Sequence, residues 1–164
     1  YIKLFKIIYF AQKEYLVNYG KVLCPDTFKA RKFGPVPALS DKVIKLVELE
    51  DEDIDQYPDL MRFRNSIRVT DQKVFGIAEP DMDYLSQKEC EYLDKWFVYC
   101  KEKDSKTELS PESHDKAYDI AYARFLEDPQ LGTLTNIEIA KAGGATDKMI
   151  AYIREKELIA TELS

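Results

Sequence analysis

His114 is the only histidine in the chain and the residue best suited to acid–base chemistry near neutral pH. A nucleophilic site would need partner groups around it, and a metal site would need further ligands. The cysteines have no spacing that relates them to this histidine, and the abundant Asp and Glu residues show no ligand-like spacing. We therefore expect His114 to be a packing or capping residue just inside a helix. We expect no enzymatic activity, metal or cofactor, and an enzyme centred on His114 is the alternative.

Phosphate-binding and disulfide motifs are also missing from the sequence. Gly143-Gly144 is its one pair of adjacent glycines, and no Lys-Ser or Lys-Thr follows it. The three cysteines, Cys24, Cys90 and Cys100, form no short-spaced pair, which favours a chain that works in the reducing cytoplasm. No signal peptide or membrane-spanning run is visible. Because the chain begins at Tyr1, residues can be missing upstream of it.

The segment from Arg31 to Val36 has the composition of a binding surface. Arg31 and Lys32 stand beside Phe33, and cations with aromatic rings dominate binding hot spots. Gly34 allows a sharp turn or the close approach of another chain. The alternative is a buried turn that locks the first helix onto the second.

The net charge of −6 argues against a generic binder of nucleic acid or of anionic membranes. The charges are unevenly distributed. Residues 1–47 carry nine Lys or Arg against three Asp or Glu, and residues 48–59 carry seven acidic residues. We expect the acidic run to be a solvated loop. The alternatives are that it faces the basic half, or that the two halves offer partners separate charged faces.

Residues 136–157 have helix-turn-helix spacing. The pattern places Ala140 at the helix crossing, Gly144 in the turn, and Ile150 and Ile153 on the docking face. A DNA reader would use the exposed side of its second helix, and the candidate DNA contacts are Thr146, Lys148, Tyr152 and Arg154. The alternative is a helical hairpin packed on the body of the protein. Nearby acidic residues would repel phosphate, so DNA binding is the less favoured interpretation.

The elements that must position these residues are mostly helical. Residues 2–19 form an apolar helix that Gly20 caps, and we expect it to be central. Residues 21–36 are expected to be extended or irregular, with turns at residues 24–26 and 34–37 and an extended backbone at Gly34 and Val36, each before a proline. A second helix follows to about Leu49. Residues 61–69 and 73–78 are expected to pair as a small antiparallel hairpin.

Two further helices are expected in the second half. A capping box at Ser86 begins one that runs to about Lys103, with Phe97 and Cys100 facing inward. Ser110-Pro111 begins another that runs to about Leu126, and residues 128–132 break it. The expected fold is α+β and mostly α-helical, with a helical domain at residues 1–130 and a helical hairpin at residues 131–164 packed on the same domain.

An ordered set of short motifs resembles one family. The set begins with Tyr9-Phe10-Ala11-Gln12, continues through the segment 28–36, and ends at Leu109-Ser110 and His114. It resembles the Panacea domain, which includes the SocA-type antitoxins. That family usually carries tryptophan where this chain has Arg31, and a proline-tryptophan pair where it has Ala117-Tyr118.

The resemblance implies an antitoxin of a bacterial or phage toxin–antitoxin system. Such a protein would neutralise a cognate protein toxin, encoded next to it, by direct binding or by delivery to a protease. The expected partner-binding residues are Tyr9, Gln12, Arg31, Phe33, Gly34, Pro35, Val36 and His114, with any exposed part of Tyr15 and Tyr19. A DNA-binding regulator that uses residues 136–157 is the alternative, and the oligomeric state stays open.

Overall fold

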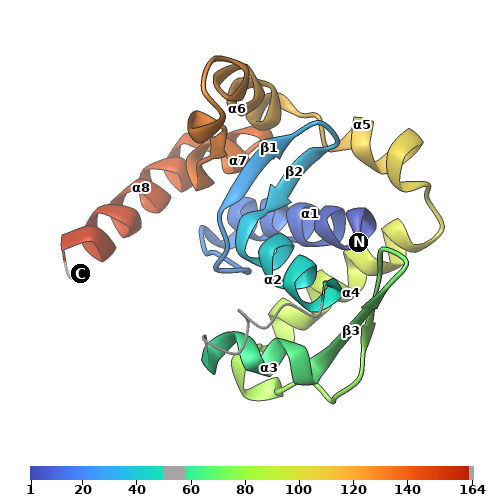
Figure 1. Ribbon diagram of the computed structural model, residues 1–164. Coiled ribbons are helices and arrows are strands. Elements are labelled where there is room, and N and C mark those ends of the chain that lie inside the picture. The colour runs from blue at the N-terminus through green and yellow to red at the C-terminus, as the bar shows by residue number, and fades with distance from the viewer. Residues whose placement is uncertain (50–57, 163–164) are drawn as a thin grey trace.

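Helix α1 (Ile2–Tyr19) lies at the centre of the protein, with the other elements around it (Figure 1). The computed structural model describes residues 1–49 and 58–162, so most of the expected acidic loop lies outside the described residues. Phe5, Tyr9, Phe10 and Leu16 of α1 are buried, because its apolar surface extends almost all round. Gly20 adopts the left-handed conformation and donates its N–H to the Leu16 carbonyl. The central helix and its cap are therefore confirmed.

A three-stranded antiparallel sheet covers one side of α1. Its strands are β1 (Phe28–Arg31), β2 (Gly34–Pro37) and β5 (Thr133–Leu134), in the order β2-β1-β5. The expected turn at residues 34–37 is wrong, since the turn lies at Lys32 and Phe33, whereas the extended backbone expected at Gly34 and Val36 is confirmed. Pro35 and Pro37 lack an N–H group, but β2 is an edge strand and can accommodate them.

A second, smaller layer follows in the chain. It contains α2 (Ala38–Glu48), α3 (Pro58–Ser66), β3 (Ile67–Thr70) and β4 (Lys73–Gly76). The β3–β4 hairpin is confirmed, but residues 61–66 are helical and not extended. Four residues of β3 pair with four residues of β4 across the tight turn at Asp71 and Gln72. The preceding residues include Met61 and two arginines, which are good helix formers.

The capping box at Ser86 and Glu89 is confirmed, and it begins α4 (Gln87–Lys101) after the short turn η2 (Met82–Tyr84). Cys100 is buried, and Trp96 packs on Phe10 with ring centroids 5.1 Å apart. Phe97 was expected inside but is 56% exposed. Fewer apolar side chains of α4 therefore face α1 than the sequence pattern indicated.

The helix expected from Ser110 to Leu126 is divided into two. A π-helical turn η3 (Ser105–Leu109) leads into α5 (Ser110–Glu112), and α6 (Lys116–Glu127) begins afresh. The cause is Asp115, whose carboxylate accepts the N–H groups of Ala117 and Tyr118 and so starts a new helix. The short helix η4 (Pro129–Leu131) occupies the expected break.

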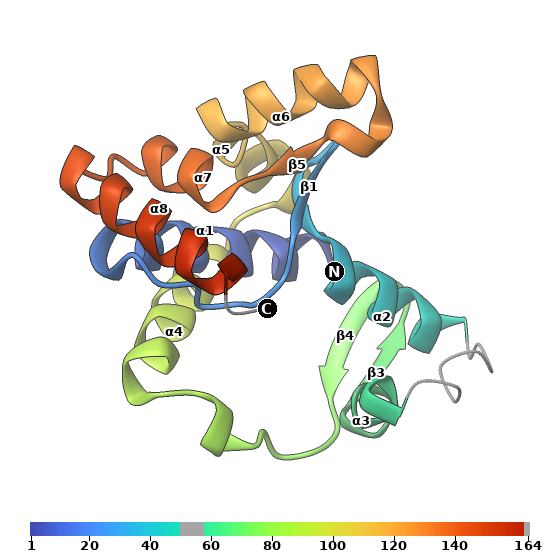
Figure 2. The same cartoon turned by 90° about the vertical axis from the view of Figure 1, so that its left-hand side faces the viewer.

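The chain ends in two helices, α7 (Asn136–Ala142) and α8 (Asp147–Glu162). Helix α7 packs against α1 and α8 runs alongside (Figure 2). Ile139, Ala140, Ile150 and Ile153 are buried between the helices. The fold is α+β and mostly helical, as expected. Among the described residues, no helix has the length and hydropathy needed to cross a membrane.

Candidate partner-binding site

Tyr9 belongs to the interior of the fold. Its side chain is fully buried, and its hydroxyl donates to both carboxylate oxygens of Asp115, at 3.0 and 2.9 Å. Lys13 Nζ also reaches Asp115, at 2.8 Å. Burial, followed by the negative charge of Asp115, raises the pKa of Tyr9. Since Asp115 begins α6, this cluster joins the central helix to α6.

Gln12 is also buried and has a structural role. Its Oε1 accepts the backbone N–H groups of Leu23 and Cys24, at 2.8 and 2.9 Å, and fixes the loop that follows α1. Tyr15 is buried too, whereas Tyr19 is partly exposed. The expectation that Tyr9 and Gln12 form a contact surface is corrected: both side chains hold the fold together.

Gly34 and Pro35 are buried at the start of β2, beside a lysine that the sequence analysis missed. Lys6 is 1% exposed, and its Nζ donates to the Pro35 carbonyl at 3.2 Å. Burial lowers the pKa of Lys6 to about 7. Gly34 has a φ of +100°, and a Cβ there would overlap Lys6 Nζ and Ser113 Oγ. Glycine is therefore required by the close packing of three elements.

His114 lies in the linker between α5 and α6, outside both helices. Its ring stacks on Tyr118 with centroids 4.1 Å apart and an interplanar angle of 10°. Desolvation, followed by the charge of Lys6, lowers the pKa of His114. It packs next to Gly34, so the structure brings these two predicted residues together.

The two departures from the family pattern contact each other. The Tyr118 hydroxyl donates to the Arg31 carbonyl at 3.0 Å. The Arg31 guanidinium lies over the ring of Phe125, 5.1 Å from its centroid. Tyr122 stacks between Tyr118 and Phe125 along α6. Arg31 therefore has a defined aromatic neighbour while its side chain remains exposed.

Phe33 lies at the tip of the β1–β2 turn and is 39% exposed. Lys32 Nζ and Lys106 Nζ lie 5.6 and 5.7 Å from its ring centroid. Arg31, Lys32, Phe33 and Val36 line a pocket of about 390 Å³, which we call the Phe33 pocket. The sequence thus identified the exposed residues of this pocket but missed Lys6, which also lines it, and Lys106, which lies beside the Phe33 ring.

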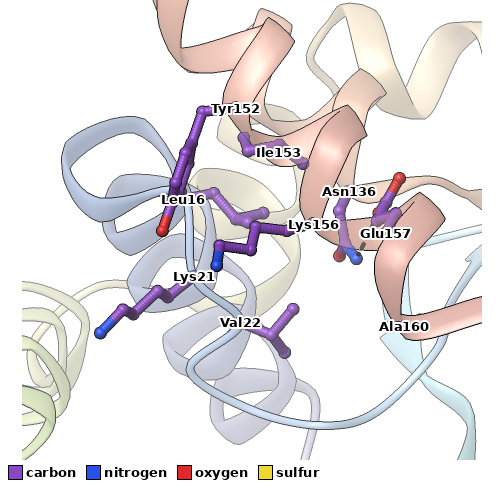
Figure 3. Close-up of a pocket in the computed structure, with 10 residues that line it drawn as sticks. Leu16, Lys21, Val22, Asn136, Tyr152, Ile153, Lys156, Glu157 and Ala160 are labelled. Atoms are coloured by element: carbon purple, nitrogen blue, oxygen red, sulfur yellow. Dashed lines mark hydrogen bonds between the residues drawn. The ribbon is translucent and has the colours of Figure 1, made fainter. Parts of the chain in front are cut away.

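A second hollow, the α8 groove, lies between the end of α1 and α8 (Figure 3). Its volume is about 490 Å³, and Leu16 and Ile153 form part of its apolar lining. Tyr152, a candidate DNA contact, extends over the α1 terminus and touches Gly20. The other candidates, Thr146, Lys148 and Arg154, are exposed. Thr146 Oγ1 accepts the Met149 N–H at 3.2 Å and so caps α8.

The part of the chain that the structure describes contains no group of three or more His, Cys, Asp or Glu side chains that could hold a metal ion.

Comparisons with curated proteins and with solved structures give no significant match. The sequence pattern of the family described as Antitoxin SocA-like, Panacea domain matches residues 4–118, more than two thirds of the chain. Helices α7 and α8 lie beyond the matched residues. The chain belongs to the antitoxin SocA-like, Panacea domain family, and this membership supports a toxin–antitoxin role in general.

Proposed function

We propose that this protein neutralises a cognate protein toxin by binding it directly, with the exposed β1–β2 turn at the centre of the contact. The observation that carries the proposal is the position of Phe33. A large aromatic side chain is 39% exposed at the tip of a hairpin whose following residues, Gly34 and Pro35, are buried. The hairpin is held by β5 on one side and by α1 beneath it.

Such a turn suits tight recognition. Aromatic and Arg side chains supply most of the energy in protein interfaces. Because the turn is already held in place, binding would order little additional chain, and the entropic cost of association would be low. A stable inhibitor needs roughly 1,200–2,000 Å² of buried surface in total. The contact would therefore extend from Phe33 to Arg31, Val36 and His114, which lie nearby.

The proposed action is association, and this chain makes or breaks no covalent bond and requires no cofactor. We place it in the cytoplasm, where Cys24, Cys90 and Cys100 would stay as the free thiols that the structure shows. Neutralisation can proceed by blocking the toxin or by delivering it to a protease. Inhibition of purified toxin without any protease would establish blocking, whereas inhibition that needs the protease would establish delivery.

The test uses the full chain and the protein encoded beside its gene. Co-expression should restore growth, and the two proteins should copurify. Phe33→Ala should weaken the complex by about thirty-fold or more, since hot-spot truncations cost about 2 kcal/mol or more. Phe97→Ala is the matched control, because Phe97 is also exposed but lies on α4. Failure of the wild-type pair both to copurify and to restore growth would refute the proposal.

DNA binding by α7 and α8 is the second candidate. The short turn, the Thr146 cap and the exposed Lys148 and Arg154 support it. Tyr152 packs against Gly20 at the end of α1 but is still 37% exposed. A true DNA complex would weaken steeply as salt increases, and neutralising Lys148 and Arg154 would abolish it. Absence of any shift with duplex DNA at low salt would end this candidate.

A further inference from the structure

We propose that the Phe33 pocket receives an acidic segment of the toxin, with one of its carboxylates placed among Lys6, Arg31 and Lys32. This inference rests on the proposed function, because it specifies the chemistry of the partner at the same turn.

The charge of the Phe33 pocket is the first argument. Four cationic side chains line it, namely Lys6, Arg31, Lys32 and Lys45. Among the described residues of its lining, the acidic one is Asp41, and Lys45 already binds it at 2.6 Å. The salt bridges within the described residues leave Lys6, Arg31 and Lys32 without a carboxylate. The pocket therefore has an excess of positive charge that a partner's carboxylate would complement.

Lys6 gives the second argument. An ammonium group has three donors, and the structure gives Lys6 Nζ one acceptor, the Pro35 carbonyl. Its side chain is 1% exposed, so water compensates little of its charge. A buried cation without an anionic partner is unfavourable. A carboxylate that enters the pocket would give Lys6 a counter-ion that the described residues of its own chain do not provide.

The lining also specifies what should accompany the carboxylate. Ile2, Phe5, Phe33 and Val36 supply apolar surface beside the cations. Lys32 Nζ and Lys106 Nζ both lie near the Phe33 ring. A volume of about 390 Å³ is at the lower end of the roughly 300–1,000 Å³ of small-molecule sites. The pocket therefore fits a short segment that has an apolar side chain next to Asp or Glu.

A protein carboxylate fits this site better than a nucleic-acid phosphate. The chain as a whole carries a net charge of −6, which would repel a polyanion that extends beyond the pocket. A single acidic segment gains from the local positive charge and avoids most of that repulsion. The cationic cluster is local, and its complement should be local too.

Zero-length carbodiimide cross-linking tests the contact directly, because it joins an amine to a carboxylate only when they touch. The wild-type chain and the protein encoded beside its gene are cross-linked and analysed by mass spectrometry. We expect toxin Asp or Glu residues to be joined to Lys32 or to Lys6. Cross-links confined to lysines outside the pocket would overturn the inference.

Charge reversal provides the second measurement. Lys32→Glu should raise the dissociation constant by about ten-fold or more, because it places a like charge against the toxin's carboxylate. Lys148→Glu is the matched control, since it makes the same charge change on an exposed lysine of α8. Urea unfolding should show that both variants are as stable as the wild type, because both positions are exposed.

The outcomes separate the inference from the function on which it rests. If the wild-type chain binds the toxin but Lys32→Glu and Lys148→Glu weaken it equally, the acidic segment is refuted and toxin binding stands. If the wild-type chain does not bind the toxin, both fail. If a short DNA duplex binds and Lys32→Glu alone abolishes that binding, the choice of a protein carboxylate is overturned.

Discussion

The interior of α1 and the β1–β2 turn carry parts of the same sequence pattern, but they have opposite physical roles. Tyr9 and Gln12 are buried and hydrogen-bonded to Asp115 and to the loop after α1. Arg31 and Phe33 are exposed at the turn. The difference shows that one sequence pattern combines buried residues that build the fold with residues that are exposed at the surface.

The turn is also where the chain departs from its family. Arg31 replaces the usual tryptophan, and its carbonyl accepts a hydrogen bond from Tyr118, which lies in the other departure. Because this bond is made to the backbone, it does not depend on which side chain stands at position 31. The turn is exposed and the α1 contacts are buried, so experiments on the two regions should give effects of very different size.

The largest effect is expected in the interior, at Tyr9. Tyr9→Ala removes a fully buried ring that packs on Phe10 and Phe28, and it leaves a cavity. Truncations of this kind cost about 3–5 kcal/mol. Urea unfolding followed by circular dichroism would measure the loss.

Tyr9→Phe is the control that separates the ring from its hydroxyl. It should cost only about 1 kcal/mol, because Asp115 keeps Lys13 and two backbone N–H groups as partners. If Tyr9→Ala lowered the free energy of unfolding by less than Tyr9→Phe does, the structural role of the Tyr9 ring would be contradicted.

The next effect concerns Gly34, which connects the interior to the turn. Gly34→Ala forces a side chain into a positive φ and against Lys6 and Ser113, at an expected cost of about 2–3 kcal/mol. Gly144→Ala is the matched control, because Gly144 also has a positive φ but its Cβ would meet open space. Gly144→Ala should lower the free energy of unfolding by about 1 kcal/mol. Equal losses in thermal or urea unfolding would show that packing at Gly34 is unimportant.

The sequence predicted this interior well where the physical signal was local. The α1 pattern, its Gly20 cap and the Ser86 capping box each depend on residues within a few positions of one another, and all three are found. The three-stranded sheet was missed because β5 pairs with β1 from more than 100 residues away. Pro35 and Pro37 indicated a turn, since nothing local shows that their strand lies at an edge.

The sequence predicted the exposed residues of the candidate site and missed the buried one. Arg31 and Phe33 were identified because charged and aromatic residues stand together in the sequence. Lys6 was missed because it is one of three lysines in α1, and the sequence gives no sign of which amine is kept from water. Lys106 comes to Phe33 only through the tertiary fold. Asp115 was detectable, since it directly precedes a helical pattern and is a favoured capping residue.

A smaller effect is expected at Lys6, where the interior and the pocket meet. Below about pH 7 both the folded and the unfolded chain carry its charge, and above that pH the folded chain releases the proton first. The unfolded chain then binds more protons, so stability rises with pH. Between about pH 7 and pH 8.5 the rise should be about 1.5 kcal/mol.

Lys6→Met isolates this contribution, because it keeps the length of the side chain without the amine. Urea unfolding of both proteins across that pH range would give the difference directly. The variant should lack the rise that the wild type shows. Parallel pH dependence of the two proteins would mean that Lys6 keeps its proton in the folded state.

The smallest effect on stability is expected at the turn itself. Phe33→Ala removes an exposed ring that lies near the amines of Lys32 and Lys106, so the free energy of unfolding should change by about 0.5 kcal/mol or less. Unfolding in urea and toxin binding would be measured on the same preparation. Wild-type stability with weakened binding is expected, because the proposed role of the turn is recognition and its exposed ring does not support the core. A loss of 2 kcal/mol or more would place Phe33 with Tyr9 among the residues that build the fold, and the distinction between the two regions would fail.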